Sequence, residues 1–477
     1  MTRESWKTRL GFILAAVGSA VGLGNLWRFP WMTGENGGAA FLVVYLAIVL
    51  LVGVPGLLGE LVVGRRGKRN PVGSLGALSG SRNWAGFGYL FVVTAVALLS
   101  FYSVVGGWIL RYVVASFGGA YFGDPEVYFE SINFGLEAVG FHLLFLGLTA
   151  FVVLRGVQRG IERAAKVMVP ALLVLLVGLA AWGLSLDGAG QGLAFFLSPD
   201  LGYLRANFLA ILPAAAGQAL FTLSLGAGTM LTYASYLGED RSLATDGTAI
   251  AGVNTLVGLL AGLVVFPILF ALGVGVGGGG PGALFVSLAG AFAALPYGQL
   301  VGVVFFGAVS LAALSSSISM LEIPVSFLVD EYGLSRRAAT AGLTGLFAAT
   351  GTVCALDPAL FDFVASTLVD LLLTGGLVGL LLFVGWVMGA DALDEYRRGA
   401  GAFASSLGTP WLYAVGVVIP LFLTFTLVSG VLAAVGVTVD PVSVLGVTFD
   451  QTRLLAVASV VLVLAAFAGL RSPRSVL

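Results

Sequence analysis

Runs of about 20 apolar residues recur along the whole 477-residue chain, and they constrain its fold more than any other feature. A bilayer core of roughly 30 Å needs about 20 apolar residues to cross it as a helix. Only 10% of the residues are charged, too few to hydrate the surface of a soluble protein of this size. The sequence therefore predicts an all-α membrane protein with twelve transmembrane helices, near residues 8–34, 37–64, 84–118, 138–154, 161–186, 207–237, 242–276, 297–330, 337–355, 361–390, 411–437 and 452–470.

Lysine and arginine residues fall almost entirely on one side of this topology. Cytoplasmic loops of membrane proteins carry an excess of Lys and Arg, and an odd number of spans would scramble the observed bias. We therefore expect both termini in the cytoplasm. A cleavable signal peptide over residues 1–20 fits less well, because the apolar run continues through Gly24 without a clean cleavage site. Of 23 cations, four fall in the outer half: Arg28, Arg111, Arg205 and Arg453.

The first apolar segment contains glycines where a membrane helix should be most regular. Gly18, Gly22 and Gly24 weaken the helix, and Asn25 and Arg28 follow closely. Non-helical backbone is tolerated at membrane depth only where protein or a polar cavity satisfies the freed amide groups. The sequence predicts a broken helix that builds a binding site at mid-depth.

A weak internal repeat supports this interpretation. Residues 20–24, Ala-Val-Gly-Leu-Gly, are matched in the sixth span by residues 224–228, Ser-Leu-Gly-Ala-Gly. The copies are five spans apart, so the second is inserted upside down, and paired breaks of this kind indicate the central site of a transporter. Packing through small residues is the alternative. We predict one domain over 1–477, with inverted repeats at 1–186 and 207–390 followed by two helices at 411–470.

Catalytic chemistry finds little support in the sequence. A single cysteine, Cys354, excludes an internal disulfide and a thiolate-rich metal site, and a single histidine, His142, excludes histidine-clustered metal chemistry. No nucleophile–base pair or cofactor fingerprint is present, and the net charge of −1 indicates no nucleic-acid partner. We expect a protein that is not an enzyme.

Four long motifs carry a family resemblance. They are Gly22 to Pro30 (GLGNLWRFP), Glu35 to Gly38 (ENGG), Arg155 to Arg163 (RGVQRGIER) and Phe221 to Gly226 (FTLSLG). From Trp6 to about Asp391 the chain resembles the neurotransmitter:sodium symporter family, close to its prokaryotic amino-acid transporters of the leucine-transporter type. The resemblance implies a five-plus-five inverted-repeat fold with broken helices 1 and 6. It also implies sodium-coupled, alternating-access import of an amino acid across a prokaryotic plasma membrane.

The resemblance implies a substrate site between the two breaks. Backbone amides around Leu23 and Gly24 hold the carboxylate beneath Tyr102, helped by the positive ends of the half-helices. No acidic residue lies in either break, which leaves room for a substrate with its own carboxylate. The implied wall is apolar and uncharged, which favours a hydrophobic side chain, and the small Ala227 with the pliable Met320 leaves room for larger ones, aromatic ones included. The implied substrate-binding residues are Ala20, Leu23, Gly24, Leu98, Tyr102, Phe221, Thr222, Ser224, Ala227, Ser316 and Met320.

Two sodium sites are implied by the same resemblance, since sodium prefers hard oxygen ligands. Serines 315–317 could instead bond back to their own helix. Site one comprises Ala20, Asn25, Thr222, Asn254 and the substrate carboxylate. Site two comprises the carbonyls of Gly18, Val21 and Ala312 with the hydroxyls of Ser315 and Ser316.

Gates and charge compensation complete the expectations. The outer gate is expected to pair Arg28 with Asp362, and the inner one Arg3 with Asp330, packed by Trp6 and Tyr236. The anion position of the family falls on Tyr45, Gln218, Thr222 and Gly258; glycine is neither acid nor hydroxyl, so chloride or proton compensation stays open, with Asp370 as a candidate proton or counter-ion residue.

The sequence leaves two alternatives to sodium-coupled import. One is proton-coupled or exchange transport of an amino acid on the same fold. The other is a nutrient sensor that binds its substrate with little transport.

Overall fold

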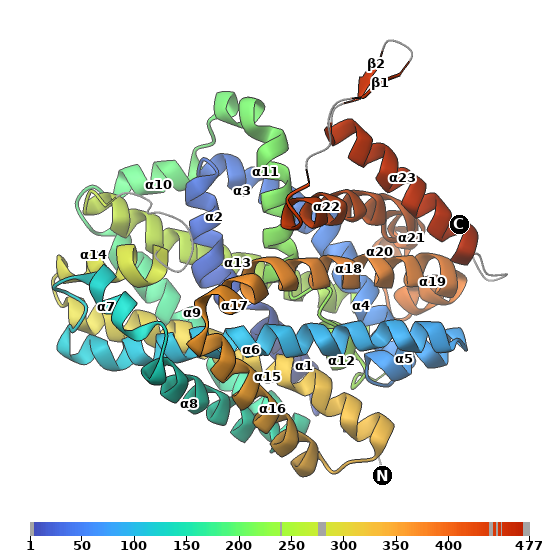
Figure 1. The fold of residues 1–477 in the computed structure, drawn as a ribbon, viewed down its shortest axis with the longest axis horizontal. Coiled ribbons are helices and arrows are strands. Elements are labelled where there is room, and N and C mark those ends of the chain that lie inside the picture. The colour runs from blue at the N-terminus through green and yellow to red at the C-terminus, as the bar shows by residue number, and fades with distance from the viewer. Residues whose placement is uncertain are drawn as a thin grey trace.

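The computed structural model describes residues 4–238, 241–274, 283–437, 442–444, 447–449 and 451–470. These residues form a helical bundle (Figure 1). By length and apolarity, ten helices in the described part can cross a membrane, and a bent pair, Arg9–Ala20 with Gly24–Glu35, makes eleven. The twelfth predicted span forms a helix whose described apolar part, Leu454–Ala465, is shorter. The all-helical membrane fold is confirmed, and a count of twelve is consistent with it.

The first five spans contain these elements in order. They are α1 (Arg9–Ala20), η1 (Gly24–Arg28) and α2 (Phe29–Glu35); α3 (Ala39–Ile48), η2 (Val49–Gly53), α4 (Val54–Gly67) and the short α5 (Pro71–Ser79); α6 (Arg82–Gly118) and α7 (Pro125–Ile132); α8 (Leu136–Val153); and η3 (Val157–Ile161), α9 (Glu162–Leu184) and α10 (Ala189–Leu197).

The remaining elements continue the bundle and add one feature that the sequence did not predict. They are α11 (Leu201–Thr222) and α12 (Thr229–Ala234); α13 (Leu243–Ala271), η4 (Ala283–Leu288) and α14 (Ala289–Ala293); α15 (Gly298–Tyr332); α16 (Arg336–Leu356); α17 (Pro358–Asp362), η5 (Phe363–Leu368), α18 (Val369–Leu382), η6 (Phe383–Met388), α19 (Ala390–Arg397) and α20 (Ala402–Ser406); α21 (Gly408–Tyr413), η7 (Ala414–Val418) and α22 (Ile419–Ala434); and α23 (Gln451–Leu470). The unpredicted feature is an antiparallel hairpin of β1 (Val442–Val444) and β2 (Val447–Phe449).

The first and sixth spans are both interrupted, as predicted. The α1–α2 pair bends by 51° between Ala20 and Gly24. The sixth span stops being helical between Thr222 and Thr229, where Gly226 and Gly228 have φ angles of +81° and +75°. Glycine adopts this left-handed region without a steric penalty. At Gly226 a Cβ would also clash with the carbonyl of Leu373, so α18 packs directly on the break.

A buried carboxylate supports the second break. Glu60 on α4 is fully buried and accepts hydrogen bonds from the backbone amides of Gly226 (2.7 Å) and Leu231 (3.3 Å). A break frees backbone amides that lipid cannot satisfy. Glu60 satisfies two of them and so holds the sixth span open.

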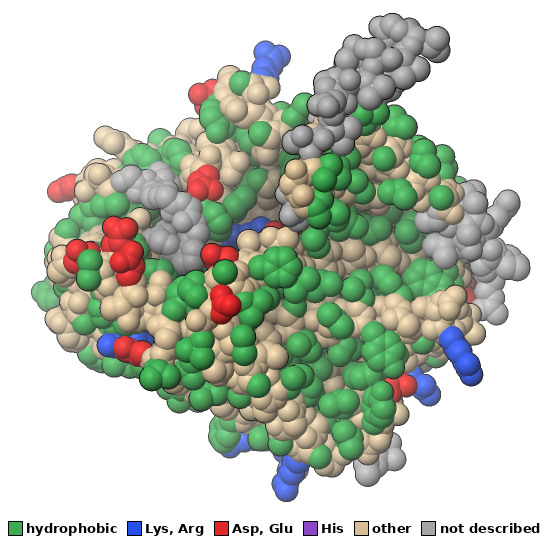
Figure 2. Space-filling model, viewed as in Figure 1, with side chains coloured by type: hydrophobic (Ala, Val, Ile, Leu, Met, Phe, Trp, Pro, Cys, Tyr) green, Lys and Arg blue, Asp and Glu red, His purple; other side chains and the backbone are tan. Residues whose placement is uncertain are grey.

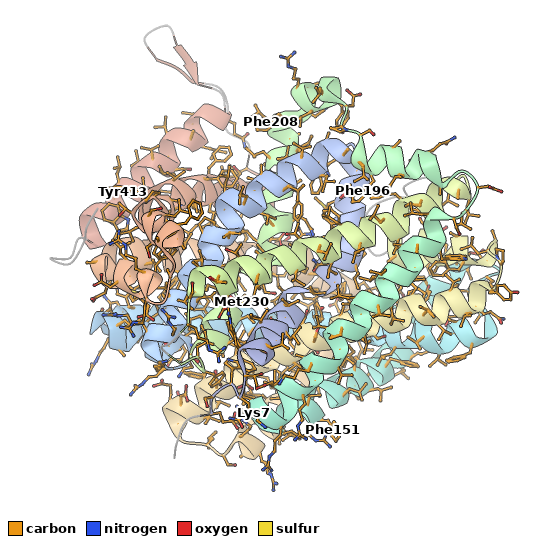
Figure 3. The ribbon with its side chains drawn as sticks, turned by 180° about the vertical axis from the view of Figure 1, so that it is seen from behind. Lys7, Phe151, Phe196, Phe208, Met230 and Tyr413 are labelled. Carbon is orange, nitrogen blue, oxygen red and sulfur yellow. The ribbon has the colours of Figure 1, made fainter. Side chains whose placement is uncertain are left out.

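The broken spans lie within a frame of long helices. Helices α6 and α15 pack along each other, and α1 packs against α9, α13 and α15 (Figure 1). Seen from behind, Met230 at the start of α12 lies near the middle of the bundle (Figure 3). Figure 2 shows apolar side chains across the broad middle of the surface, with charged ones mainly toward its edges. Such an apolar band suits a protein embedded in lipid.

Candidate functional site

A cavity lies where the two broken spans meet. The break after α1, the break after α11, and helices α6, α15 and α18 all contribute side chains to it. Every predicted substrate residue except Thr222 lines the cavity, together with Gly22, Thr229 and Leu373, which the sequence reading missed. The full lining is Ala20, Gly22, Leu23, Gly24, Leu98, Tyr102, Phe221, Ser224, Ala227, Thr229, Ser316, Met320 and Leu373.

One end of the cavity offers donors suited to a carboxylate. The backbone amide of Leu23 donates to the Tyr102 hydroxyl over 3.3 Å, so the two expected carboxylate contacts lie side by side. Gly22 permits this approach, since a Cβ there would lie 2.3 Å from Ser316 Oγ and 2.8 Å from Tyr102 Oη. A carboxylate placed between the amide and the hydroxyl could accept from both.

The oxygens of the second expected sodium site converge on Ser315. Its hydroxyl donates to the carbonyls of Gly18 (2.5 Å) and Ala312 (2.9 Å) and lies 3.4 Å from that of Val21. The bond to Ala312 lies within α15, so the serine also bonds back to its own helix. Turning this hydroxyl would present its lone pairs, with the three carbonyls, to a cation.

Ser316 contributes differently from the expectation. Its hydroxyl donates to the carbonyls of Ser19 (3.0 Å) and Val21 (3.3 Å) while it also lines the cavity. The Ser19 carbonyl belongs to no predicted set. Ser316 therefore joins the oxygen cluster around Ser315 to the cavity.

The first expected sodium site is a buried polar chain across three spans. Asn25 Nδ2 donates to Asn254 Oδ1 (3.0 Å) and to the Asn254 carbonyl (2.9 Å), and Asn254 Nδ2 donates to Thr222 Oγ1 (3.3 Å). The three side chains are fully buried. Ala20 lines the adjoining cavity, so the structure brings all four predicted residues to one region.

Besides Thr222, which belongs to this chain, three anion or proton candidates lie beside it. Gln218 Nε2 donates to the Gly24 carbonyl (2.7 Å), and its buried Oε1 has no hydrogen-bond partner among the described residues. Tyr45 is buried against Phe29. A Cβ at Gly258 would lie 3.7 Å from Phe29 and 3.8 Å from Asn25 Nδ2. Asp370, the remaining candidate, lies elsewhere, beside Arg28.

Asp370 occupies the position that the sequence reading gave to Asp362. The Arg28 guanidinium donates to both Asp370 oxygens (3.4 and 3.3 Å) and lies 4.9 Å from the centre of the Phe221 ring. The Arg28–Asp362 pair is therefore a wrong prediction for this conformation. Eight helical residues advance a side chain by about 12 Å, and Asp362 is exposed at the end of α17 while Asp370 lies beyond η5 at the level of Arg28.

Trp6 packs on the short helix α12 that follows the second break. Its indole nitrogen donates to the Tyr233 carbonyl (2.8 Å), and its ring lies 6.3 Å from that of Tyr236. Arg3 lies outside the described residues, so its predicted pairing is not described. Asp330 accepts a hydrogen bond from the Asn70 amide (2.9 Å).

A charge network beside Trp6 was not predicted. Arg336 donates to Glu322 (2.7 Å) and to Glu4 (2.7 Å), and the Tyr236 hydroxyl donates to Glu322 (2.8 Å). Glu322 is fully buried in α15. An acidic residue in an apolar span, followed by Arg336 and Arg337, is the signal that could have revealed it.

Comparison with known proteins agrees with this geometry. A family model described as the sodium:neurotransmitter symporter family matches residues 3–122 and 129–465. The chain belongs to this family. The chain is 35% identical to YhdH, an uncharacterized sodium-dependent transporter of Bacillus subtilis, over 87% of this chain and 95% of the relative. It is 34% identical to an uncharacterized sodium-dependent transporter of Methanocaldococcus jannaschii, over 89% of both chains.

A solved structure is similar throughout. The crystal structure of MhsT in complex with L-phenylalanine matches with a TM-score of 0.80 and 36% identity, over 90% of this chain and all of that one. The neurotransmitter:sodium symporter resemblance and the broken-helix transporter fold are thereby confirmed. The chain is a multi-pass membrane protein of a sodium-dependent transporter family.

Proposed function

We propose that this symporter imports a hydrophobic amino acid, aromatic ones included, together with sodium ions by alternating access. The observation that carries the proposal is the cavity between the two breaks, with carboxylate donors at one end and largely apolar walls beyond. MhsT, whose structure contains L-phenylalanine, supports an amino acid of this class.

Two sodium ions would be coupled to the substrate through shared ligands. The oxygen cluster around Ser315 joins the cavity through Ser316, and the Asn25–Asn254–Thr222 chain lies beside Gly24. One sodium ion moving inward gains about 2.3 kcal/mol per 100 mV. Two ions would supply about 4.6 kcal/mol, a little over three tenfold steps in accumulation.

The arrangement of helices suits alternating access. Helices α6, α8, α15 and α16 pack on one another as a frame, while α4 packs on α12 and α13. Arg28 lies over Phe221, which lines the cavity, and Trp6 packs on α12, whose first residue also lines it. Rocking the first, second, sixth and seventh spans against the frame would open one side at a time. Both termini would be cytoplasmic, following the distribution of Lys and Arg.

Flux into proteoliposomes tests the proposal. Purified symporter should accumulate labelled hydrophobic amino acid under an inward sodium gradient, and replacing sodium with choline should abolish uptake. Uptake in choline driven by a proton gradient or by internal amino acid would favour the proton-coupled or exchange alternative. Stoichiometric sodium-dependent binding without flux would favour a sensor.

Substrate identity requires a separate measurement. A competition screen of the twenty amino acids against sodium-dependent binding should rank hydrophobic and aromatic ones first. A preference for charged amino acids would contradict the largely apolar cavity.

A further inference from the structure

A buried threonine lines the substrate cavity without any role in the sodium or carboxylate sites. Thr229 is the first residue of α12, is 1% exposed, and lines the cavity. Neighbouring hydrogen bonds are formed by Leu231 and Thr232, and among the described residues none involves the Thr229 hydroxyl. Because Thr229 lines the cavity, a ligand group able to pair with its hydroxyl would gain a hydrogen bond there.

The contact between Gly228 and helix α6 indicates where Thr229 lies along the cavity. Gly228, next to Thr229, approaches Phe91 so closely that a Cβ there would lie 2.9 Å from Phe91 Cβ. Tyr102, at the carboxylate end, is eleven residues further along the same helix, a rise of about 16 Å. Thr229 is therefore displaced from Tyr102 toward the other end of the cavity, where a long substrate side chain would point.

The surfaces between these ends are apolar. Leu98, Ala227, Met320 and Leu373 line the cavity, and the methyl group of Ala227 takes little of its space. An extended side chain could therefore pass Ala227 and reach Thr229, while a short aliphatic one could not. A threonine hydroxyl both donates and accepts, so it can pair with a phenol hydroxyl.

We propose that Thr229 is a specificity-determining residue that hydrogen-bonds the polar tip of a long, otherwise apolar substrate side chain, with the phenol of tyrosine as its ligand. The proposal rests on the amino-acid import proposed above and names the member of that substrate class that the cavity favours. Tyrosine should bind more tightly than phenylalanine, which leaves the hydroxyl unpaired.

Competition binding with purified full-length protein in sodium tests the proposal. The unaltered protein should bind tyrosine about tenfold more tightly than phenylalanine, the range of one buried neutral hydrogen bond. Thr229→Val keeps the shape and removes the hydroxyl, so it should reduce the ratio of the two affinities from about tenfold to about one. Thr229→Ser, which keeps the hydroxyl, should retain the preference.

The outcomes separate this proposal from the one on which it rests. Equal affinities in the unaltered protein, or a preference that survives in Thr229→Val, would overturn the role of Thr229 and leave amino-acid import standing. Failure of the unaltered protein to bind either amino acid in sodium would overturn both proposals. Retained phenylalanine binding by Thr229→Val shows in the same experiment that the variant is folded.

Discussion

Replacing Asp370 should weaken substrate binding, whereas replacing Asp362 should not. Arg28 is held over Phe221 by two contacts, the paired hydrogen bonds to Asp370 and the approach to the Phe221 ring. The pair is partly solvated, with Arg28 and Asp370 side chains 18% and 42% exposed. A pair of this exposure contributes about 1 kcal/mol at most, and the cation–π contact remains in Asp370→Asn.

A change of about 1 kcal/mol in the closed state corresponds to about a fivefold weaker affinity. Asp370→Asn should therefore raise the dissociation constant of labelled substrate, measured at saturating sodium, by up to about fivefold. The matched variant Asp362→Asn should change it less than twofold. The reverse order, with Asp362→Asn impaired and Asp370→Asn unaffected, would refute the reasoning and restore the pairing expected from sequence.

Three further predictions address the second sodium site, the break in the first span and the charge network beside Trp6. Ser315→Ala should raise the sodium concentration for half-maximal substrate binding at least threefold. The matched variant Ser326→Ala should not, because this hydroxyl bonds to the Ile323 carbonyl of its own helix. Equal curves would exclude Ser315 as a ligand. Gly22→Ala should abolish substrate binding, because its Cβ would lie 2.3 Å from Ser316 Oγ. The matched variant Gly178→Ala, with open space around it, should bind substrate normally. Intact binding by Gly22→Ala would contradict the close approach. Glu322→Gln should lower the melting temperature in detergent, since breaking its buried ion pair with Arg336 costs about 3 kcal/mol. Glu137→Gln, at the partly exposed pair with Arg111, should have little effect. Similar shifts in the two variants would count against a buried network.

The parts of the site that follow from local backbone chemistry were predictable. Gly22 and Gly24 weaken the helix within an apolar run, and the first span bends there. The residues around them line the cavity. Leu373 was missed because it comes from the tenth span, where no motif marks it.

Charge pairing depended on tertiary geometry that the sequence does not display. Which aspartate of the tenth span meets Arg28 depends on the path of the chain through η5. Glu4, Glu322 and Arg336 come together from three regions of the chain, so their pairing required the packed bundle. The residues were visible in the sequence, but their partners were not.

The dependence of substrate binding on sodium concentration tests the central claim most directly, that the two broken spans hold an amino acid and sodium together. Labelled amino acid should bind purified protein with steep sodium dependence, and Asn254→Ala combined with Ser315→Ala should lose that dependence. Binding that is equal in sodium and choline, or sodium dependence that survives the double substitution, would contradict the account.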